Sequence, residues 1–389
     1  MSTEATPHAK PIYNVKNPFI ATVKTAYDIS GPGAPKNTRH YELDLAGSGL
    51  EYIPGDSLAV QPANDPALVA DTLAALGLTG DEIVKHAKNG ADVPLRQTLI
   101  EANSLTEVDT KLVKAIVEKT GGASPLAAFI APEAKDELKK YLWGRFVIDL
   151  LLENPTAKFE AQEFVSLLKK LNIRLYSISS SLKANPEEVH LTVATVKYTS
   201  HGRERGGVAS TFLAERVTLN ETRIPIFVNA GKGFRLPDPS EDVPVIFCGP
   251  GTGIAPFRAF LQERKVTNAK GKAWLFFGEV SEKTCFFYKD EFEGYLADGT
   301  LSKLTTAWSR DQAEKIYVQH KMLEHSAELY AWLEQGAIFY VCGDASRMAG
   351  DVDKALHTII EKEGGKTPEE AIAYMAALKE AKRYRRDVY

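Results

Sequence analysis

The chain has 389 residues, of which 44% are hydrophobic and 25% are charged, and its formal net charge is −4. This length exceeds one ordinary hydrophobic core and predicts two or three domains. The slightly acidic balance argues against general nucleic-acid binding, which usually shows a basic footprint. No apolar run reaches the roughly 20 residues that a membrane-spanning helix needs, and the first residues lack the apolar stretch of a secretory signal.

The cysteines are Cys248, Cys285 and Cys342. Their number is odd and their spacing is not that of metal ligands, so we expect reduced thiols, no metal site and a cytoplasmic protein. None of these bulk properties points to a reaction.

Residues 1–14 are polar, and we expect them to be disordered. Strand-like alternation between turn residues begins after them and returns much later in the chain. The predicted strands cover residues 19–27, 39–45, 58–60, 174–178, 189–198 and 224–229. Short strands at this spacing predict a small antiparallel β-barrel built from residues 15–64 and 172–237.

Residues 65–171 interrupt that barrel with apolar residues at helical spacing. Helices are predicted over residues 66–76, 111–119, 133–152 and 161–170. The insert holds no cluster of catalytic residue types, so we expect it to be a scaffold.

Residues 238–389 alternate apolar strands with helical runs. Strands are predicted at residues 243–247, 273–277, 304–307 and 338–342, and helices at residues 255–264, 289–298, 327–335 and 347–363. This alternation predicts a doubly wound α/β domain, in which helices cover both faces of a parallel sheet. The predicted fold is therefore an antiparallel β-barrel interrupted by an α-helical insert and followed by an α/β doubly wound parallel-sheet domain.

A glycine-rich turn, Gly249–Pro256, directly follows the first strand of the α/β domain. Its glycines let the backbone approach a phosphate, and the helix behind it offers free N–H groups to negative charge. Pro256 suits the first turn of that helix, where its missing N–H has no partner to lose. The spacing differs from the usual dinucleotide motif, so a turn without a ligand is the alternative.

Ser309, Arg310 and Lys315 follow a later strand of the same domain and therefore belong to the carboxyl edge of the predicted sheet. An NAD site offers an acidic residue to the ribose 2′-hydroxyl, whereas this set suits a 2′-phosphate. Tyr317 could stack on an adenine ring. Taken by itself, the segment is also typical of an exposed polar loop.

Two further segments have the character of cofactor contacts. In the strand Arg174–Ile178, Arg174 and Tyr176 share one face, and these side chains bind pyrophosphate and pack on aromatic rings respectively. Gly206 and Gly207 open a predicted helix whose N-terminus is a second potential anion site. An ordinary surface strand and a capped helix explain these segments almost as well.

The last two signals are weak when taken singly. Cys342 ends a strand, where a cysteine is more often part of the core than catalytic. The basic terminal stretch 383–389 is of a kind that is usually frayed and solvated.

In combination, these segments resemble the FAD/NADPH half of the diflavin reductases, within the ferredoxin–NADP reductase superfamily, and most of all the flavoprotein subunits of NADPH-dependent sulfite reductases. The resemblance runs from about residue 15 to residue 389. It is carried by the ordered segments RLYSISSS, GGVASTFL, FRLP, CGPGTGIAPFRAFLQER, LFFG, AWSRDQ, KIYVQ, YVCGDASRMAGDV and RYRRDVY. It implies that the barrel binds FAD and that the α/β domain binds NADPH.

For FAD, the resemblance implies that the R-x-Y-S strand supplies an Arg to the pyrophosphate, a Tyr to the isoalloxazine and a Ser near flavin N5. Further contacts fall on the strand that begins at Thr192, on Tyr198 and on the G-x-A-S segment. The implied FAD residues are Arg174, Leu175, Tyr176, Ser177, Thr192, Val193, Ala194, Tyr198, Gly207, Val208, Ala209, Ser210 and Tyr389.

For NADPH, the resemblance implies a 2′-phosphate site, one further contact at Asp351, and a glycine turn that faces the nicotinamide. The implied NADPH residues are Gly251, Thr252, Gly253, Ser309, Arg310, Lys315, Tyr317, Gln319 and Asp351.

The resemblance also implies catalytic roles for Ser177, Cys342, Asp387 and Tyr389. Cys342 corresponds to the residue beside nicotinamide C4, and Asp387 to a tail carboxylate near it. Tyr389 corresponds to a terminal aromatic residue that covers the flavin, so the tail is expected to gate the approach of nicotinamide. NADPH would deliver hydride to flavin N5, and the flavin would release electrons one at a time.

The chain departs from the diflavin pattern because it leaves no room for the FMN domain that precedes the FAD half. We therefore expect either a fragment of a longer protein or a subunit that reduces a separate FMN or flavodoxin-like protein, a ferredoxin or a sulfite reductase hemoprotein. The leading interpretation is an NADPH-oxidising FAD subunit of a sulfite-reductase-type electron chain. A stand-alone ferredoxin or flavodoxin–NADP reductase and a non-catalytic scaffold are the alternatives. The long insert opposes the first, and the intact Arg174, Ser177 and Cys342 oppose the second.

Overall fold

A computed structural model describes residues 13–389, so most of the segment 1–14 that was predicted to be disordered lies outside the described part. Its described end is ordered, since Asn14 forms a β-bridge with Asn17. The described chain divides into two compact units. The first comprises residues up to 59, residues 175–194 and residues 218–389, and the second comprises residues 60–174 and 195–217. Most barrel strands thus belong to the same unit as the α/β part, and the domain boundaries proposed from the sequence stay a prediction.

The antiparallel part of the first unit contains sheets with strand orders β1-β11-β4-β7 and β2-β3-β8. The bounds are β1 Phe19–Ala21, β2 Val23–Asp28, β3 Thr38–Asp44, β4 Ser57–Val60, β7 Arg174–Ser177, β8 Glu188–Ala194 and β11 Ile224–Asn229. The pairs β1–β11, β2–β3 and β3–β8 are antiparallel, and a bridge between Ile178 and Leu191 joins the two sheets. The predicted antiparallel architecture is therefore confirmed.

Two of the strands predicted as continuous are wrong, because the structure divides each of them into two strands. The strand predicted over residues 19–27 is interrupted at Thr22, next to a bulge in the β2–β3 ladder. The strand predicted over residues 189–198 ends at Ala194, and β9 (Lys197–Ser200) begins a hairpin with β10 (Arg203–Gly206). His201 and Gly202 both have positive φ, as the two central residues of a tight hairpin turn require. This local turn draws residues 197–200 away from the β8 ladder.

The α/β part of the first unit has a parallel sheet of order β14-β13-β12-β15-β16. Its strands are β12 Val245–Cys248, β13 Ala273–Glu279, β14 Lys303–Trp308, β15 Ile338–Gly343 and β16 Tyr384–Val388. Its helices are α8 Ala255–Thr267, α9 Glu282–Cys285, α10 Lys289–Ala297, α11 Val318–Glu324, α12 Ser326–Glu334, α13 Met348–Gly364 and α14 Pro368–Glu380.

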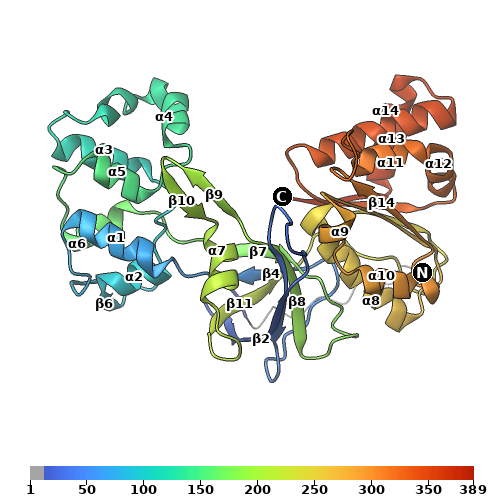
Figure 1. The fold of residues 1–389 in the computed structure, drawn as a ribbon, viewed down its shortest axis with the longest axis horizontal. Helices are drawn as coiled ribbons and strands as arrows, with labels where there is room; N and C mark the ends of the chain where they lie inside the picture. Colours follow the sequence, from blue (N-terminus) through green and yellow to red (C-terminus); the bar gives the residue numbers. More distant parts are fainter. Residues whose placement is uncertain (1–12) are drawn as a thin grey trace. The chain divides into compact units, whose positions relative to one another are not determined.

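Successive strand residues of this sheet point to opposite faces, and both faces are covered (Figure 1). Phe247 and Tyr340 pack against Phe257 of α8 on one face. Ile246 and Phe339 pack against apolar residues of α11–α14 on the other. Helices on both faces confirm the predicted doubly wound fold.

The C-terminal tail is not frayed, so that reading of the terminal stretch is wrong. β16 pairs in parallel with β15, and its buried Tyr384 contacts Phe339. A parallel strand needs a crossover, and α13 followed by α14 provides it. The tail therefore owes its order to a helix, α14, that the sequence analysis did not predict.

The second unit is mostly helical, as expected, and has its own apolar core. Its elements are α1 Pro66–Leu76, β5 Ile83–Lys85, β6 Asp92–Pro94, α2 Leu95–Glu101, α3 Thr110–Lys119, α4 Lys135–Leu142, α5 Val147–Glu153, α6 Ala161–Leu167 and α7 Val208–Thr211, with β9 and β10. The single helix predicted over residues 133–152 is wrong, because Gly144 has φ +76° and separates α4 from α5. The β5–β6 hairpin was also not expected in a helical insert.

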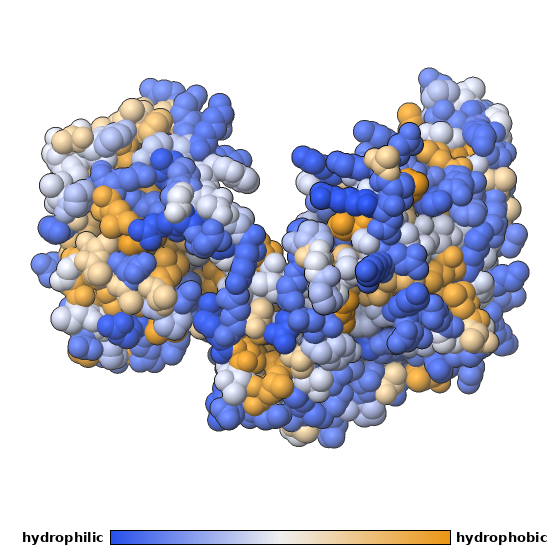
Figure 2. Space-filling view, in the orientation of Figure 1, coloured by the Kyte–Doolittle hydropathy of each residue, from blue (hydrophilic) through white to orange (hydrophobic). Residues whose placement is uncertain are grey.

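The face of the molecule in Figure 2 is mainly hydrophilic, with scattered apolar patches. Scattered exposed apolar residues are ordinary on a protein surface. None of the helices within residues 13–389 combines the length and the apolar character needed to cross a membrane.

A buried ion pair joins the β9–β10 hairpin to α5 within the second unit. Arg205 donates to both carboxylate oxygens of Asp149, at 2.6 and 2.5 Å, and its guanidinium lies over the Phe146 ring. The two side chains are only 3% and 7% exposed. Removing Arg205 would leave the buried Asp149 carboxylate with only the Phe146 N–H and a longer contact to Arg203, at 3.8 Å.

We therefore expect Arg205→Met to lower the free energy of unfolding of this unit by about 3–5 kcal/mol. Thermal unfolding of the two proteins checks this. Lys85→Met, which breaks the exposed pair with Asp92, is the matched control and should cost less than about 1 kcal/mol. Equal losses of unfolding free energy in the two variants would contradict the larger contribution assigned to the buried Arg205–Asp149 pair.

Candidate functional site

A cleft of about 500 Å³ opens at the carboxyl edge of the parallel sheet. Loops at this edge are where doubly wound sheets bind ligands. The cleft is lined by Pro250, Gly251, Gly278, Glu279, Val280, Ala307, Ser309, Tyr317, Val318, Gln319, Asp344, Arg347, Met348 and Asp351. The structure thus brings together Gly251, Ser309, Tyr317, Gln319 and Asp351, which the sequence analysis had placed in one site.

The glycine turn at one wall of the cleft has no room for a side chain at Gly249 or Gly253. A Cβ on Gly253 would lie 2.1 Å from the carbonyl oxygen of Cys342, and one on Gly249 would lie 2.5 Å from the Phe257 ring. Gly251 has φ +59°, a conformation that favours glycine. The turn therefore presses its backbone against β15 and leads directly into α8, with Pro256 in the first turn as predicted.

The opposite wall is built on the ends of β13 and β14. The backbone N–H groups of Ser309 and Arg310 donate to the carbonyls of Glu279 and Val280, which fixes the loop. The side chains of Arg310 and Lys315 are exposed, and Tyr317 is 42% exposed. Gln319 approaches Asp351 at 3.5 Å. Tyr317 lines the cleft, whereas Arg310 and Lys315 are not among the lining residues and lie close to Ser309 and Tyr317 only in sequence. An accessible aromatic ring in a loop that carries cations suits a phosphorylated nucleotide.

Sequence reasoning missed Glu279 and Arg347, which also line the cleft. Burial raises the pKa of Glu279 above its ordinary value. Arg347 stands beside Asp344, whose carboxylate accepts hydrogen bonds from the N–H groups of Arg347 and Met348 and caps α13. The available signal was that Glu279 ends β13 and Arg347 lies in the loop after β15, because strand ends form the ligand edge.

Ser177, Cys342 and Asp387 form one polar network, although they come from three distant parts of the chain. The Ser177 hydroxyl donates to Asp387 Oδ2 at 2.9 Å, and Cys342 Sγ lies 3.9 Å from the same oxygen. Cys342 is fully buried and faces Asp387 in the β15–β16 ladder. Burial and the Asp387 charge raise the pKa of the Cys342 thiol well above its ordinary value, so the thiol stays protonated.

Tyr389 lies two residues after Asp387 in the sequence and carries an accessible ring. Its backbone N–H donates to the Gly343 carbonyl, its own carbonyl accepts from Ala345, and its hydroxyl lies 2.9 Å from Thr252 Oγ1. The residue is nevertheless 63% exposed. The backbone is fixed while the ring lies open to solvent beside the glycine turn.

The predicted FAD residues of the first unit differ in exposure. In β7, Leu175 is 48% exposed, while Tyr176 and Ser177 are half-buried. In β8, Thr192 and Val193 are buried and Ala194 is half-buried. The Thr192 hydroxyl lies 2.6 Å from the Tyr288 hydroxyl, so its side chain points into the protein.

The remaining predicted FAD residues belong to the second unit. Arg174 is exposed, and Tyr198 is 43% exposed. Gly207 is the N-terminal cap of α7 and has no side chain to bond the first N–H groups of the helix. A Cβ there would lie 2.8 Å from Ser210 Oγ, so Gly207, Val208, Ala209 and Ser210 form a compact turn. Accessible aromatic and cationic side chains with a side-chain-free helix start suit a flavin nucleotide.

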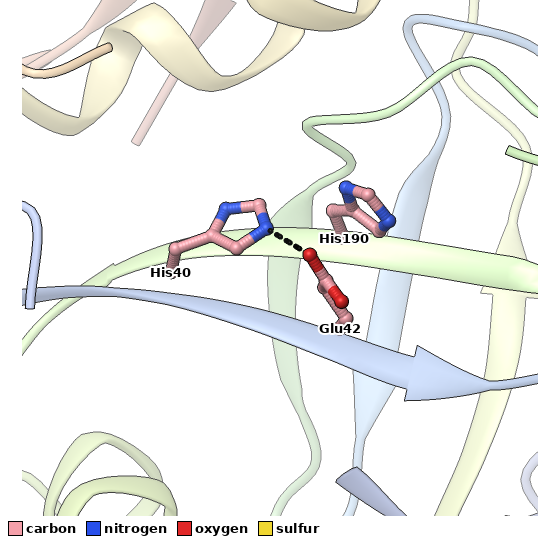
Figure 3. Close-up of side chains that lie close together, drawn as sticks. All are labelled: His40, Glu42 and His190. Carbon is pink, nitrogen blue, oxygen red and sulfur yellow. Dashed lines mark ion pairs between the residues drawn. The ribbon is translucent and has the colours of Figure 1, made fainter. Parts of the chain in front are cut away.

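Among residues 13–389, His40, Glu42 and His190 form a group whose ligand atoms are close enough to hold a metal (Figure 3). An Arg258 N–H points at His190 Nδ1 from 3.2 Å. Because arginine only donates, Nδ1 must accept and the proton sits on Nε2, so neither ring nitrogen of His190 offers a free lone pair to a metal. The neighbouring guanidinium also repels a cation, so this chemistry opposes a metal centre.

The chain matches known families over both parts. The FAD binding domain family matches residues 12–212, and the oxidoreductase NAD-binding domain family matches residues 247–354. These matches confirm the predicted pair of cofactor domains. In keeping with the reduced thiols expected, the cysteines are buried and free.

The chain is also similar to curated sulfite reductase [NADPH] flavoprotein alpha-components. It is 48% identical to that of Bacillus subtilis (strain 168) over 377 residues, which is 97% of this chain and 62% of the relative. It is 45% identical to those of Aliivibrio fischeri and Zymomonas mobilis, again over 97% of this chain and 61% of each relative. The chain thus spans about three fifths of the length of these relatives.

The burial of His40 leads to a prediction about how the stability of the fold changes as the pH falls. Burial, with Arg258 adding to it, lowers the pKa of His40 from an ordinary 6.5 to about 2. Between these values the unfolded chain binds a proton that the folded protein does not. The free energy of unfolding therefore falls as the pH drops below about 6.5, by up to about 1.4 kcal/mol per pH unit. We expect His40→Gln to show a smaller loss of melting temperature between pH 7.5 and 5.5 than the parent protein.

Thr192→Val is the matched control, because it disturbs Tyr288 in the same cluster without removing a titrating group. Relative to the parent protein, Thr192→Val should lower the melting temperature by the same amount at pH 7.5 and at pH 5.5. A His40→Gln protein that keeps the full loss on acidification would contradict the assignment.

Proposed function

This chain belongs to the FAD binding domain family, and we propose that it is an NADPH-dependent flavoprotein reductase of the sulfite reductase type. It would take hydride from NADPH and pass electrons singly to a separate acceptor. The observation that carries the proposal is the Ser177–Asp387–Cys342 network, together with a nucleotide-sized cleft that the exposed Arg347 lines. The similarity to flavoprotein alpha-components supports the same conclusion.

The chain's own residues would bind and orient the two cofactors. Arg310 and Lys315 would hold the 2′-phosphate, Tyr317 the adenine, and Gly251–Gly253 the nicotinamide side of NADPH. FAD would be held by Arg174, Tyr176, Tyr198 and the turn Gly207–Ser210, with Ser177 near flavin N5. When bound, this pair supplies hydride transfer between the nicotinamide and flavin rings.

Asp387 has two tasks in this scheme. It accepts the hydrogen bond of Ser177 and thereby fixes that hydroxyl. Its negative charge also favours a cationic ring nearby, as an oxidised nicotinamide would be. Cys342 stays a neutral, protonated thiol, so it provides packing and a weak hydrogen bond rather than a nucleophile.

The electron acceptor and the compartment are also part of the proposal. The relatives are named as the flavoprotein component of sulfite reductase, so we expect a hemoprotein, ferredoxin or FMN protein to take the electrons. Buried free thiols agree with a reducing cytoplasm.

Purified protein tests the central proposal directly. Its flavin is identified by release and chromatography, and oxidation of NADPH and of NADH is followed with ferricyanide as acceptor. We expect bound FAD and a strong preference for NADPH. A colourless protein, or one that ignores NADPH, would overturn the proposal, and bound FMN would overturn the cofactor assignment.

The 2′-phosphate site predicts a change of nucleotide preference. A hydrogen bond to a charged group contributes about 1.5–3 kcal/mol, so Arg310→Ala should lower kcat/KM for NADPH about 10- to 100-fold. The value for NADH should change little. Lys321→Ala, which removes a half-buried cation paired with Glu324, is the control and should leave kcat/KM for both nucleotides unchanged. Equal losses for NADPH and NADH in the Arg310 variant would contradict the site.

The tail predicts a second change. If the Tyr389 ring covers the flavin, a nicotinamide must displace it, and an aromatic stack contributes about 0.5–1.5 kcal/mol. Tyr389→Ala should therefore shift the ratio of NADPH to NADH kcat/KM about two- to tenfold, because NADH has less binding energy to displace the ring. Tyr389→Phe keeps the ring and loses only the Thr252 contact, so its ratio should stay at the parent value. An unchanged ratio in the Ala variant would refute gating by the tail.

A further inference from the structure

One face of α8 joins the nucleotide part of the first unit to the barrel segment that follows β7. Arg258 and Gln262 lie four residues apart and share one side of this helix, and Glu263 directly follows Gln262. Each contacts the segment Ser179–His190. We call these three residues the α8 seam.

Arg258 is the centre of the seam and is 5% exposed. One guanidinium nitrogen donates to the Ser179 carbonyl at 2.8 Å and approaches His190 Nδ1 at 3.2 Å. The other nitrogens donate to Glu291 of α10 at 2.8–3.1 Å. The guanidinium also lies over the Tyr288 ring. A planar fork of donors held from several sides has little freedom to move.

Gln262 and Glu263 extend the contact along the helix. Gln262 Oε1 accepts from the backbone N–H of Ser181 and from the Asn185 amide, both at 2.9 Å. Glu263 accepts from the Ser181 hydroxyl at 2.5 Å and pairs with Lys183 at 2.6 Å. The barrel segment is therefore held by backbone as well as side-chain atoms.

The seam lies between two pieces of backbone that carry the candidate chemistry. Ser179 and Ser181 follow Ser177 directly along the chain, and the glycine turn runs straight into the first residue of α8. A shift of α8 along the barrel would move the glycine turn relative to Ser177. A displacement of about 1 Å between reacting groups can cost on the order of 100-fold in rate.

We propose that Arg258, supported by Gln262, is a positioning residue that sets the distance between the nicotinamide turn and Ser177, and so the efficiency of hydride transfer. This rests on the function proposed above. Arg258 lies behind the site and is assigned no contact with either cofactor. Its loss should slow hydride transfer without weakening the binding of the adenosine half of NADPH.

The test uses the FAD-loaded protein with Arg258→Gln and Arg258→Lys. The Lys variant keeps a positive charge, but its single ammonium cannot span Glu291 and the Ser179 carbonyl as the guanidinium fork does, so it remains informative if the Gln variant does not fold. Lys265→Gln is the matched control, since it removes a cation from the same helix that pairs with Asp298 outside the seam. Rapid mixing with NADPH measures flavin reduction and the nicotinamide–flavin charge-transfer absorbance. Titration with adenosine 2′,5′-bisphosphate measures nucleotide binding.

Both Arg258 variants should reduce flavin at least about tenfold more slowly, with a weaker charge-transfer band and adenosine bisphosphate affinity within about twofold of the parent protein. Rates equal to those of Lys265→Gln, or an equal loss of nucleotide affinity, would overturn the proposal.

Hydrogen exchange without NADPH separates the seam from the proposed function. Amides at residues 178–182 and 249–256 should exchange faster in the Arg258 variants and not in Lys265→Gln. Unchanged exchange in the Arg258 variants would refute the coupling of these two segments by Arg258. If the parent protein fails to oxidise NADPH, the proposed function fails, whereas the exchange result still decides whether Arg258 couples the two backbones.

Discussion

The parallel pairing of β16 with β15 is the interaction on which the candidate site depends. It places Asp387 opposite Cys342, within reach of Ser177, and fixes the backbone of Tyr389 through Gly343. A slip of one residue would bring Arg386 to the position of Asp387 and reverse the charge of the network. The register of one short edge strand therefore decides the electrostatics of the whole site.

The second constraint is the close approach of the glycine turn to β15. Any side chain at Gly253 would collide with the Cys342 carbonyl, so the turn and the strand must be packed backbone to backbone. This contact brings Thr252 against the Tyr389 hydroxyl. Tight packing behind the turn and an open cleft in front of it are features of a site that holds a ligand by its backbone.

Most of the fold could be predicted because apolar periodicity records which face of an element is buried. The ends of helices also carry local signals. In α1, Asp65 caps the first turn, Pro66 begins the helix and Gly77 ends it with φ +71°. The errors occur where local and distant effects compete. Gly144 divides an otherwise continuous helical pattern, and β16 is a polar segment whose order comes from pairing with β15.

The sequence by itself determined the cofactor classes through its resemblance to the diflavin reductases, and it predicted the residue types of the site from glycine turns and strand ends, which carry local signatures. Only the tertiary structure decided which side chains meet. Ser177 and Asp387 are 210 residues apart and share one hydrogen bond, and Arg258 reaches Ser179 across 79 residues. Local propensity carries no information on such contacts, since they arise only when separate elements pack into one core.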